Sequence, residues 1–276
     1  MRAATGGSPP FSLAAKVRKY SEAARLGLRN RLAYKGNVAG RLLTYCLFVF
    51  VFSRIWTSVF EGRPPIEGYG KEAAIWYFIV AEISAFGFAR FFGTVGEDVK
   101  SGQIAYLLAR PYSFVGYSFA QAIGPTLYDA SLLALAGGIL GSLFAGPIPL
   151  QGPAQALALL ASLLLAACLQ YLLQTALALT AFWVEENSAF YWIYQKFVLV
   201  CGTLIPLEFL PDVAQRVAFL TPIPWLTWAP ARILSRWSPE AAPGMLLAQL
   251  AWTLAAAALC GLVFSLGRRR LVAQGG

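Results

Sequence analysis

The side chains that most often carry out chemistry in proteins are scarce in this sequence. Its 276 residues include no histidine, which excludes a Ser-His-Asp triad, a Cys-His pair and a histidine metal site for this chain alone. Four cysteines lie scattered in apolar runs without CxxC spacing, and they are Cys46, Cys168, Cys201 and Cys260. Such cysteines are typical of small apolar fillers between helices. We therefore expect neither a catalytic residue nor a bound metal.

Ionisable residues inside apolar runs are the next candidates, because a charge in lipid is costly and usually faces protein or water. Four of those that fall there are Arg54, Glu82, Arg90 and Asp129. On antiparallel helices, Arg54 and Glu82 would lie within about one turn of the same depth. We predict that these two pair or face a shared polar cavity. Both a purely structural pair and a role in substrate contact or gating stay open.

The remaining two residues have simpler interpretations. Arg90 lies near the end of an expected helix, where its long side chain can reach the headgroup region. Asp129 either lines a cavity open to the inside or makes a hydrogen bond between helices. None of these spacings resembles a catalytic dyad, and the phosphate-binding pattern GxxxxGK[ST] is absent from the sequence. Any nucleotide energy must come from another chain, so no cofactor is expected on this one.

The scaffold that positions these residues is expected to lie largely in lipid. Hydrophobic residues make up 58% of the chain and charged residues 13%, against about 45–50% and about 25% in soluble domains. Six apolar runs approach the ~20 residues that cross a ~30 Å hydrocarbon layer. They lie at about 38–60, 72–93, 117–144, 154–183, 189–207 and 244–266. The sequence therefore predicts an all-α membrane protein with a six-helix transmembrane domain, 38–276.

The first 37 residues form a basic segment with a helical pattern. The net charge of the chain is +9, and most of it comes from nine Lys and Arg in residues 1–41. An apolar run follows at once, so a membrane surface is a better partner than nucleic acid. The apolar stripe comprises Leu13, Val17, Tyr20, Ala24, Leu28 and Leu32. The cations expected to contact anionic lipid are Lys16, Arg18, Lys19, Arg25 and Arg29. The alternative is a helix packed on the protein's own cytoplasmic surface.

Charge also predicts the orientation. Residues 268–270 are all arginine, and with six spans both termini share one side, which the positive-inside rule assigns to the cytoplasm. The segments 94–116 and 185–187 are then cytoplasmic, while 61–71 and 208–243 lie outside. The segment 208–243 is too apolar for a free loop and too rich in proline to span, which predicts short re-entrant or surface-lying helices. We expect Trp225, Trp228 and Trp237 in an interfacial belt.

Three short segments carry a resemblance to a known family. The cytoplasmic segment contains Glu97, Asp98, Lys100, Gly102 and Gln103, followed by Leu107-Leu108-Ala109-Arg110-Pro111. A second segment runs from Gly202 to Pro211, and the third is the basic tail from Gly267. Together they resemble the type-2 ABC exporter permease family, in its branch with six spans and no fused ATPase.

The resemblance implies an assembly in which this chain does no chemistry. A second permease chain, identical or related, would complete the membrane unit in the cell's inner or plasma membrane. Two separate ABC ATPase subunits would carry ATP and Mg. The coupling segment, 96–113, would dock on the ATPase through Glu97, Asp98, Lys100, Gly102, Gln103, Leu107, Leu108, Arg110 and Pro111. An external gate would comprise Ile205, Pro206, Leu207, Glu208, Phe209 and Pro211.

Two observations from the residues bear on this implication. Leu107 and Leu108 are apolar residues on a cytoplasmic element, which indicates a buried contact with a partner, although an ordinary membrane-surface helix is the alternative. A secondary transporter or channel without an ATPase would show an internal repeat with matched broken helices, and none is visible. A membrane-embedded enzyme would need converging polar groups at one depth, for which only Arg54, Glu82 and Asp129 are available.

Overall fold

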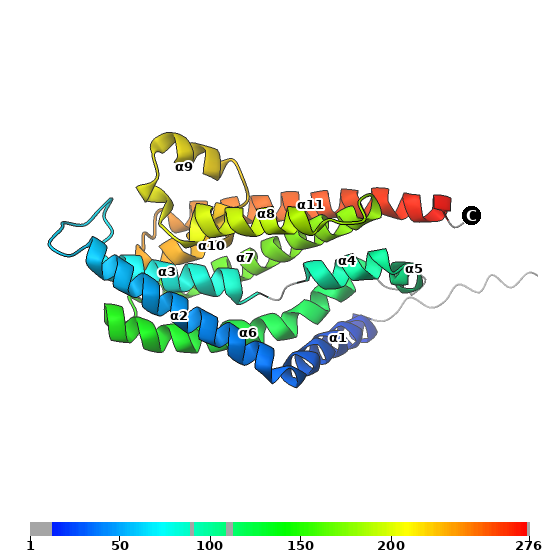
Figure 1. The fold of residues 1–276 in the computed structure, drawn as a ribbon, viewed down its shortest axis with the longest axis horizontal. Coiled ribbons are helices and arrows are strands. Elements are labelled where there is room, and N and C mark those ends of the chain that lie inside the picture. Colours follow the sequence, from blue (N-terminus) through cyan, green and yellow to red (C-terminus); the bar gives the residue numbers. More distant parts are fainter. Residues whose placement is uncertain (1–12, 89–90, 109–112, 275–276) are drawn as a thin grey trace, which may run out of the picture.

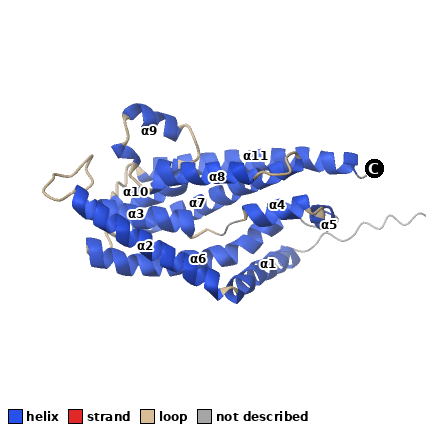
Figure 2. Cartoon of the chain, viewed as in Figure 1, coloured by secondary structure: helices blue, strands red, loops and turns tan. Residues whose placement is uncertain are grey.

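The computed structural model describes residues 13–88, 91–108 and 113–274, and within these ranges the regular structure is helical (Figures 1 and 2). The longer helices are α1 (Leu13–Ala33), α2 (Lys35–Val59), α3 (Lys71–Phe86), α6 (Phe114–Ala145), α7 (Pro153–Leu179) and α11 (Ala242–Gln274). The shorter ones are α4 (Phe92–Lys100), α5 (Gln103–Leu108), η1 (Thr180–Phe182), α8 (Ser188–Val198), η2 (Leu199–Thr203), η3 (Leu207–Phe209), α9 (Asp212–Phe219) and α10 (Pro224–Ser235).

Four helices are long and apolar enough to cross a membrane. They lie at Lys35–Val59, Phe114–Ala145, Pro153–Phe182 and Ala242–Arg270, and they match four of the six expected spans. The other two expected spans are shorter. Helix α3 has 16 residues, and α8 has 11 residues followed by the five-residue π-helix η2. The structure therefore confirms an all-helical membrane fold and leaves the six-span count a prediction.

The short helix α3 is enclosed by protein. Most of its residues are buried, including Trp76, Tyr77 and Phe78, because α2, α6 and α10 pack around it. It ends at Gly87, where a β-carbon would come within 3.2 Å of the Ala130 Cα atom in α6. A helix that faces protein on most sides need not match the full thickness of the lipid.

Helix α1 lies along α6, as Figure 1 shows for the two labelled helices. Its backbone approaches α6 closely, since a β-carbon on Gly27 would collide with the carbonyl oxygen of Gln121, and one on Gly124 with that of Ala24. Small residues at a helix crossing permit this approach. The stripe formed by Tyr20, Ala24 and Leu28 is thus turned toward α6, as in the alternative of a helix packed on the protein's own surface. Arg18, Arg25 and Arg29 are exposed, and the side chain of Lys16 lies outside the described residues.

The segment 208–243 folds into short helices, as expected, but its tryptophans are not exposed at a membrane interface. Trp225 and Trp228 retain 9% and 7% exposure and contact the ring of Phe219, so the interfacial-belt prediction is wrong for both. The reason is that α10 packs against α3 and α7 inside the bundle. The amide of Gln249 in α11 fixes this arrangement by donating to the Trp225 carbonyl oxygen at 2.8 Å. Trp237 is half-buried.

The bundle has two distinct ends (Figure 1). Helices α1, α4 and α5 and the C-terminal end of α11 lie at one end. The 61–70 turn, α9 and α10 lie toward the other. This grouping is the one that the charge pattern predicts for the two sides of the membrane.

The close crossing of α1 and α6 yields a prediction about stability. We expect Gly124→Ala to lower the free energy of unfolding by about 1–3 kcal/mol, since the added methyl group overpacks a backbone contact. Gly138→Ala is the matched control in the same helix, because its β-carbon meets no atom within 4 Å. Thermal unfolding of the purified protein in detergent measures both. Equal melting temperatures for the two variants would contradict the close crossing.

Candidate functional site

The segment expected to couple to an ATPase forms a helical hairpin, which we call the coupling hairpin (α4, the turn at Ser101–Gly102, and α5). Gly102 has φ of +74°, a conformation that glycine adopts at little cost. Val95, Val99 and Ile104 are buried in an apolar cluster that also contains residues of α7, η1 and α11. The hairpin is therefore attached to the bundle by its apolar side.

The opposite side of the coupling hairpin is polar and exposed. Glu97, Lys100 and Gln103 are exposed, Asp98 is half-buried, and Tyr106 retains 64% exposure. Leu107, which the sequence assigned to a partner contact, packs against the protein's own apolar cluster. The side chain of Leu108, together with Arg110 and Pro111, lies outside the described residues. Among the described residues, Tyr106 is the large exposed side chain of α5, and the sequence analysis had not singled it out.

The coupling hairpin contacts the turn that follows α7. Lys100 Nζ lies 3.8 Å from Glu186 Oε2, and Glu186 Oε1 accepts a 2.8 Å hydrogen bond from the Ser188 backbone N–H. The hydrogen bonds from Ser188, followed by the Lys100 charge, lower the pKa of Glu186. Burial, followed by the nearby Glu97 charge, raises the pKa of Asp98. Asp98 on the coupling hairpin and Glu186 in the turn that the hairpin contacts therefore have pKa values that shift in opposite directions.

The predicted pairing of Arg54 with Glu82 is wrong. Glu82 is fully buried in α3, and neither of its carboxylate oxygens has a hydrogen-bond partner in the part of the chain that the structure describes. Arg54 is exposed on α2. Helix rotation explains the error, because equal depth on two helices does not place two side chains on facing sides. Arg90 lies outside the described residues.

Asp129 makes the expected contact between helices and also lines a cavity, whose opening to the inside stays a prediction. Its carboxylate accepts a 2.9 Å hydrogen bond from Arg31 Nε and pairs with Arg41, so it links α6 to α1 and α2. It also lines a cavity of about 730 Å³. The sequence analysis had counted Arg31 and Arg41 only as part of the basic N-terminal segment. The signal available in the sequence was Asp129 itself, a single acidic residue within an apolar run that needs a basic partner.

One further ionisable residue escaped the sequence analysis. Lys196 falls within the expected span 189–207 and is exposed on α8. Its neighbours one turn away, Ile193 and Val200, retain 55% and 54% exposure. A lysine on such an apolar face is not expected to face lipid alone.

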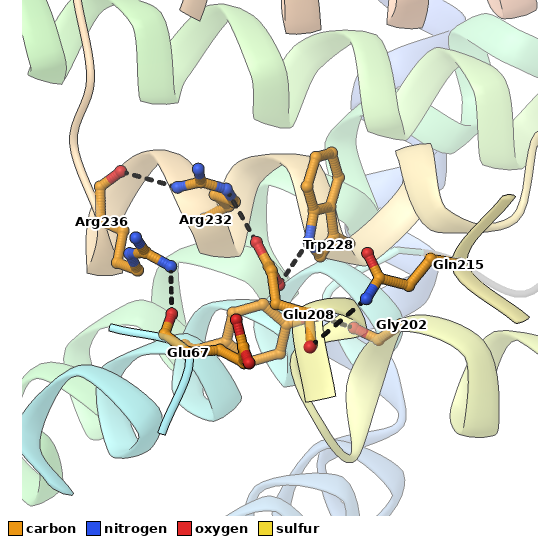
Figure 3. Close-up of polar contacts among 8 residues, drawn as sticks. Glu67, Gly202, Glu208, Gln215, Trp228, Arg232 and Arg236 are labelled. Atoms are coloured by element: carbon orange, nitrogen blue, oxygen red, sulfur yellow. Dashed lines mark hydrogen bonds and ion pairs between the residues drawn. The ribbon is translucent and has the colours of Figure 1, made fainter. Parts of the chain in front are cut away.

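The expected external gate contains a network of polar contacts, which we call the outer polar cluster (Glu208, Gln215, Trp228, Arg232 and Arg236; Figure 3). Glu208 Oε1 lies 2.8 Å from Arg232 Nε, and Glu208 Oε2 accepts a 3.1 Å hydrogen bond from Trp228 Nε1. Gln215 in α9 donates to the Glu208 carbonyl oxygen at 3.4 Å. These contacts join η3 to both α9 and α10.

The outer polar cluster also reaches the 61–70 turn. Arg236 donates a 2.6 Å hydrogen bond to the Glu67 carbonyl oxygen and lies over the Tyr69 ring. Burial, with a smaller contribution from the Glu208 charge, raises the pKa of Tyr69. The two arginines were absent from the expected gate, although charged residues in an apolar segment could have indicated them.

The apolar residues of the expected gate differ in exposure. Pro206 and Leu207 are buried, Ile205 and Phe209 are partly buried, and Pro211 is exposed. The Phe209 ring contacts Trp56 of α2 and Tyr69. The residues around Glu208 therefore connect α2, α10 and the 61–70 turn at one end of the bundle.

The long apolar helices of this fold define a multi-pass α-helical membrane protein. The sequence matches the family described as ABC-2 family transporter protein over residues 42–275. Because this match covers most of the chain, the protein belongs to that family of membrane transport components and is consistent with a type-2 ABC permease. Membership implies association with an ABC ATPase subunit. No curated protein matches the sequence.

The outer polar cluster predicts a coupled pair of mutations. Glu208→Arg should lower the melting temperature, since it opposes two positive charges where each partner is about one-fifth exposed (19% for Glu208 and 20% for Arg232). Combining it with Arg232→Glu should restore about 1–2 kcal/mol of the lost free energy of unfolding. Asp212→Asn, at an exposed position of α9, is the control. Strictly additive effects in the double variant would contradict a direct ion pair.

Asp98 on the coupling hairpin and Glu186 beside it should affect stability in opposite ways as the pH changes. An acid whose pKa is raised by folding destabilises the protein as the pH rises from the pKa of the unfolded state to that of the folded state. An acid whose pKa is lowered by folding stabilises the protein at neutral pH, and this contribution is lost as the pH falls through the pKa of the folded state. At pH 7, Asp98→Asn should therefore raise the melting temperature and Glu186→Gln should lower it. Both differences should vanish in acid, well below about pH 4. Thermal unfolding at both pH values tests this, and shifts of the same sign at pH 7 would contradict it.

Proposed function

We propose that this chain is the membrane-spanning permease subunit of an ATP-driven ABC exporter. It acts as a dimer with a second permease chain, identical or related, above separate ATPase subunits that bind ATP and Mg²⁺. The observation that carries the proposal is the coupling hairpin, which buries its apolar side in the bundle and presents a polar side beside both terminal helices. Membership in the ABC-2 family supplies the class of partner.

The proposed topology has six crossings with both termini in the cytoplasm of a cell's inner or plasma membrane. Helix α3 and the α8–η2 pair complete the four long helices, and both are about 24 Å long at 1.5 Å per residue. The shortfall of α3 against a ~30 Å layer is tolerable because protein surrounds it. The exposed face of α8 would be covered by the second permease chain. The basic residues of α1 and the 268–270 tail support the cytoplasmic assignment of this end.

Coupling would pass from the hairpin into the bundle through α7. Helix α4 contacts α7 and η1, and the Phe91 backbone N–H donates to Gln174 Oε1 at 3.2 Å. A displacement of α4 by an ATPase would thus reach α7 and its neighbour α11. An ATP-dependent shift requires contacts that differ between two states. The outer polar cluster, at the opposite end, is a set of contacts suited to open and close the external gate.

Two cations support a position for the second permease chain. Arg54 on α2 and Lys196 on α8 are exposed at membrane depth, where a charge is costly unless it faces protein or water. The faces that carry them would therefore meet the second permease chain or line the path between the two. This assigns α2 and α8 to the centre of the dimer.

The proposal predicts that the exposed side of the coupling hairpin holds an ATPase. We expect Tyr106→Ser to reduce the amount of co-purified ATPase about tenfold, as the loss of an aromatic contact residue at an interface does. Its effect on the melting temperature should be small, because Tyr106 is largely exposed. Leu107→Ala should instead lower the melting temperature, because Leu107 packs in the bundle.

The control is Val213→Ser, at an exposed position of α9 on the opposite end. It should change neither the melting temperature nor the co-purified ATPase. Cargo transport by the chain alone, with no ATPase in the preparation, would sink the proposal in favour of a secondary transporter or channel.

A further inference from the structure

The cavity beside Asp129 is a polar chamber at the junction of three helices, and we call it the inner cavity. Its volume is about 730 Å³, within the range of small-molecule sites. Residues of α1, α2 and α6 line it, together with Phe86, Phe91 and Thr94 from the α3–α4 region. It lies where α1 meets the start of α2, beside the first long apolar helix. An occupant of this cavity would sit beside the beginning of a membrane span.

Among the residues that the structure describes, the lining of the inner cavity carries one more positive than negative charge. Arg31 binds Asp129 with two nitrogens, at 2.9 Å and 2.8 Å, and Arg41 pairs with the same carboxylate. Arg41 also donates a 2.9 Å hydrogen bond to the Phe88 carbonyl oxygen. Asp129 is 2% exposed, and the two arginine side chains are 19% and 14% exposed. Asp129 is the one acidic residue among the described residues that line the cavity, so two guanidinium groups share a single carboxylate.

The rest of the lining supplies hydrogen-bond donors. Asn30, Asn37 and Gln121 bring side-chain amides, and Thr94 brings a hydroxyl group; the Thr44 hydroxyl already donates to the Gly40 carbonyl oxygen at 2.9 Å. An excess cation in a partly desolvated site favours an anion, and amide and hydroxyl donors complete the coordination of its oxygens. The lining therefore favours a ligand with one negative charge and several acceptor oxygens.

We propose that the inner cavity binds the phosphodiester headgroup of an anionic phospholipid from the adjacent leaflet. A phosphodiester carries a single negative charge, which balances the cluster, whereas a phosphate monoester carries about −1.5 to −2. The apolar residues Phe86, Phe91 and Pro125 in the lining offer contacts to the glycerol and the first methylenes of a lipid. A headgroup held there would fasten α1 to α2 and α6. Only the identity of the leaflet rests on the proposed topology.

The test measures lipid binding to the full-length chain purified without an ATPase, so its outcome is independent of ATP coupling. Native mass spectrometry should show phosphatidylglycerol retained in preference to phosphatidylcholine. Arg31→Gln should weaken retention of phosphatidylglycerol about tenfold, as expected for the loss of one charge-assisted contact. Arg25→Gln, on the same helix, measures the attraction of anionic lipid to the surface, because Arg25 is 62% exposed and lies outside the cavity lining. It should weaken retention much less than Arg31→Gln does.

A second variant separates binding from folding. Gly40 lines the cavity, and a β-carbon on it meets no atom within 4 Å. Gly40→Leu should therefore occupy part of the cavity while leaving Arg31, Arg41 and Asp129 in place. We expect it to retain less phosphatidylglycerol and to keep the melting temperature of the lipid-free protein. A loss of binding in Arg25→Gln equal to that in Arg31→Gln would overturn the proposal in favour of general surface attraction.

The source of the phosphate is tested by competition. Inorganic phosphate at millimolar concentration should leave bound phosphatidylglycerol in place if the lipid headgroup is the ligand. Displacement by inorganic phosphate would overturn the proposal in favour of a site for free phosphate. Equal retention of phosphatidylglycerol and phosphatidylcholine would also overturn it, because it would show that the excess positive charge selects no anion.

Discussion

The carboxylate of Asp129 is the contact on which one end of this structure depends. It lies in the interior of α6 and is almost fully buried, where an unpaired charge would be too costly to keep. Arg31 from α1 and Arg41 from α2 remove that cost. In doing so they hold the N-terminal helix against the bundle, at the site where Gly27 and Gly124 already allow close approach. The basic N-terminal segment is thereby a structural part of the transport domain.

The opposite end is also held together by a carboxylate paired with an arginine. Glu208 is paired with Arg232 and bound by Trp228, which draws η3 and α10 together, and Arg236 extends the contacts to the 61–70 turn. Between the two ends the bundle is largely apolar, and α3, with its buried Glu82, is enclosed by its neighbours. Because a close-packed interior deforms little, the proposed coupling would have to change discrete contacts at the two ends of the bundle.

Much of the fold was accessible from the sequence, because hydrophobic runs near 20 residues long report membrane helices directly. The positions of α2, α6, α7 and α11, the short helices of 208–243 and the grouping of the ends all followed from apolar length, proline and charge. The direction in which individual side chains point could not be predicted in the same way. Arg54 and Glu82 share a depth but not a facing side, and Trp225 and Trp228 are buried because α10 packs into the bundle. Arg41 and Lys196 lie inside the expected spans 38–60 and 189–207, so the criterion that identified Arg54 would have found them. The contact of Arg31 with Asp129 depends on helix rotation and crossing, which a single sequence does not reveal.

The central claim is that the exposed side of the coupling hairpin is held by an ATPase during transport. The most direct test replaces the exposed Gln103 with a photo-reactive amino acid and irradiates intact membranes that contain the working assembly. The account predicts a cross-link from this position to the ATPase subunit. Cross-links only to lipid or to this same chain, in an assembly whose ATP hydrolysis still responds to cargo, would contradict it.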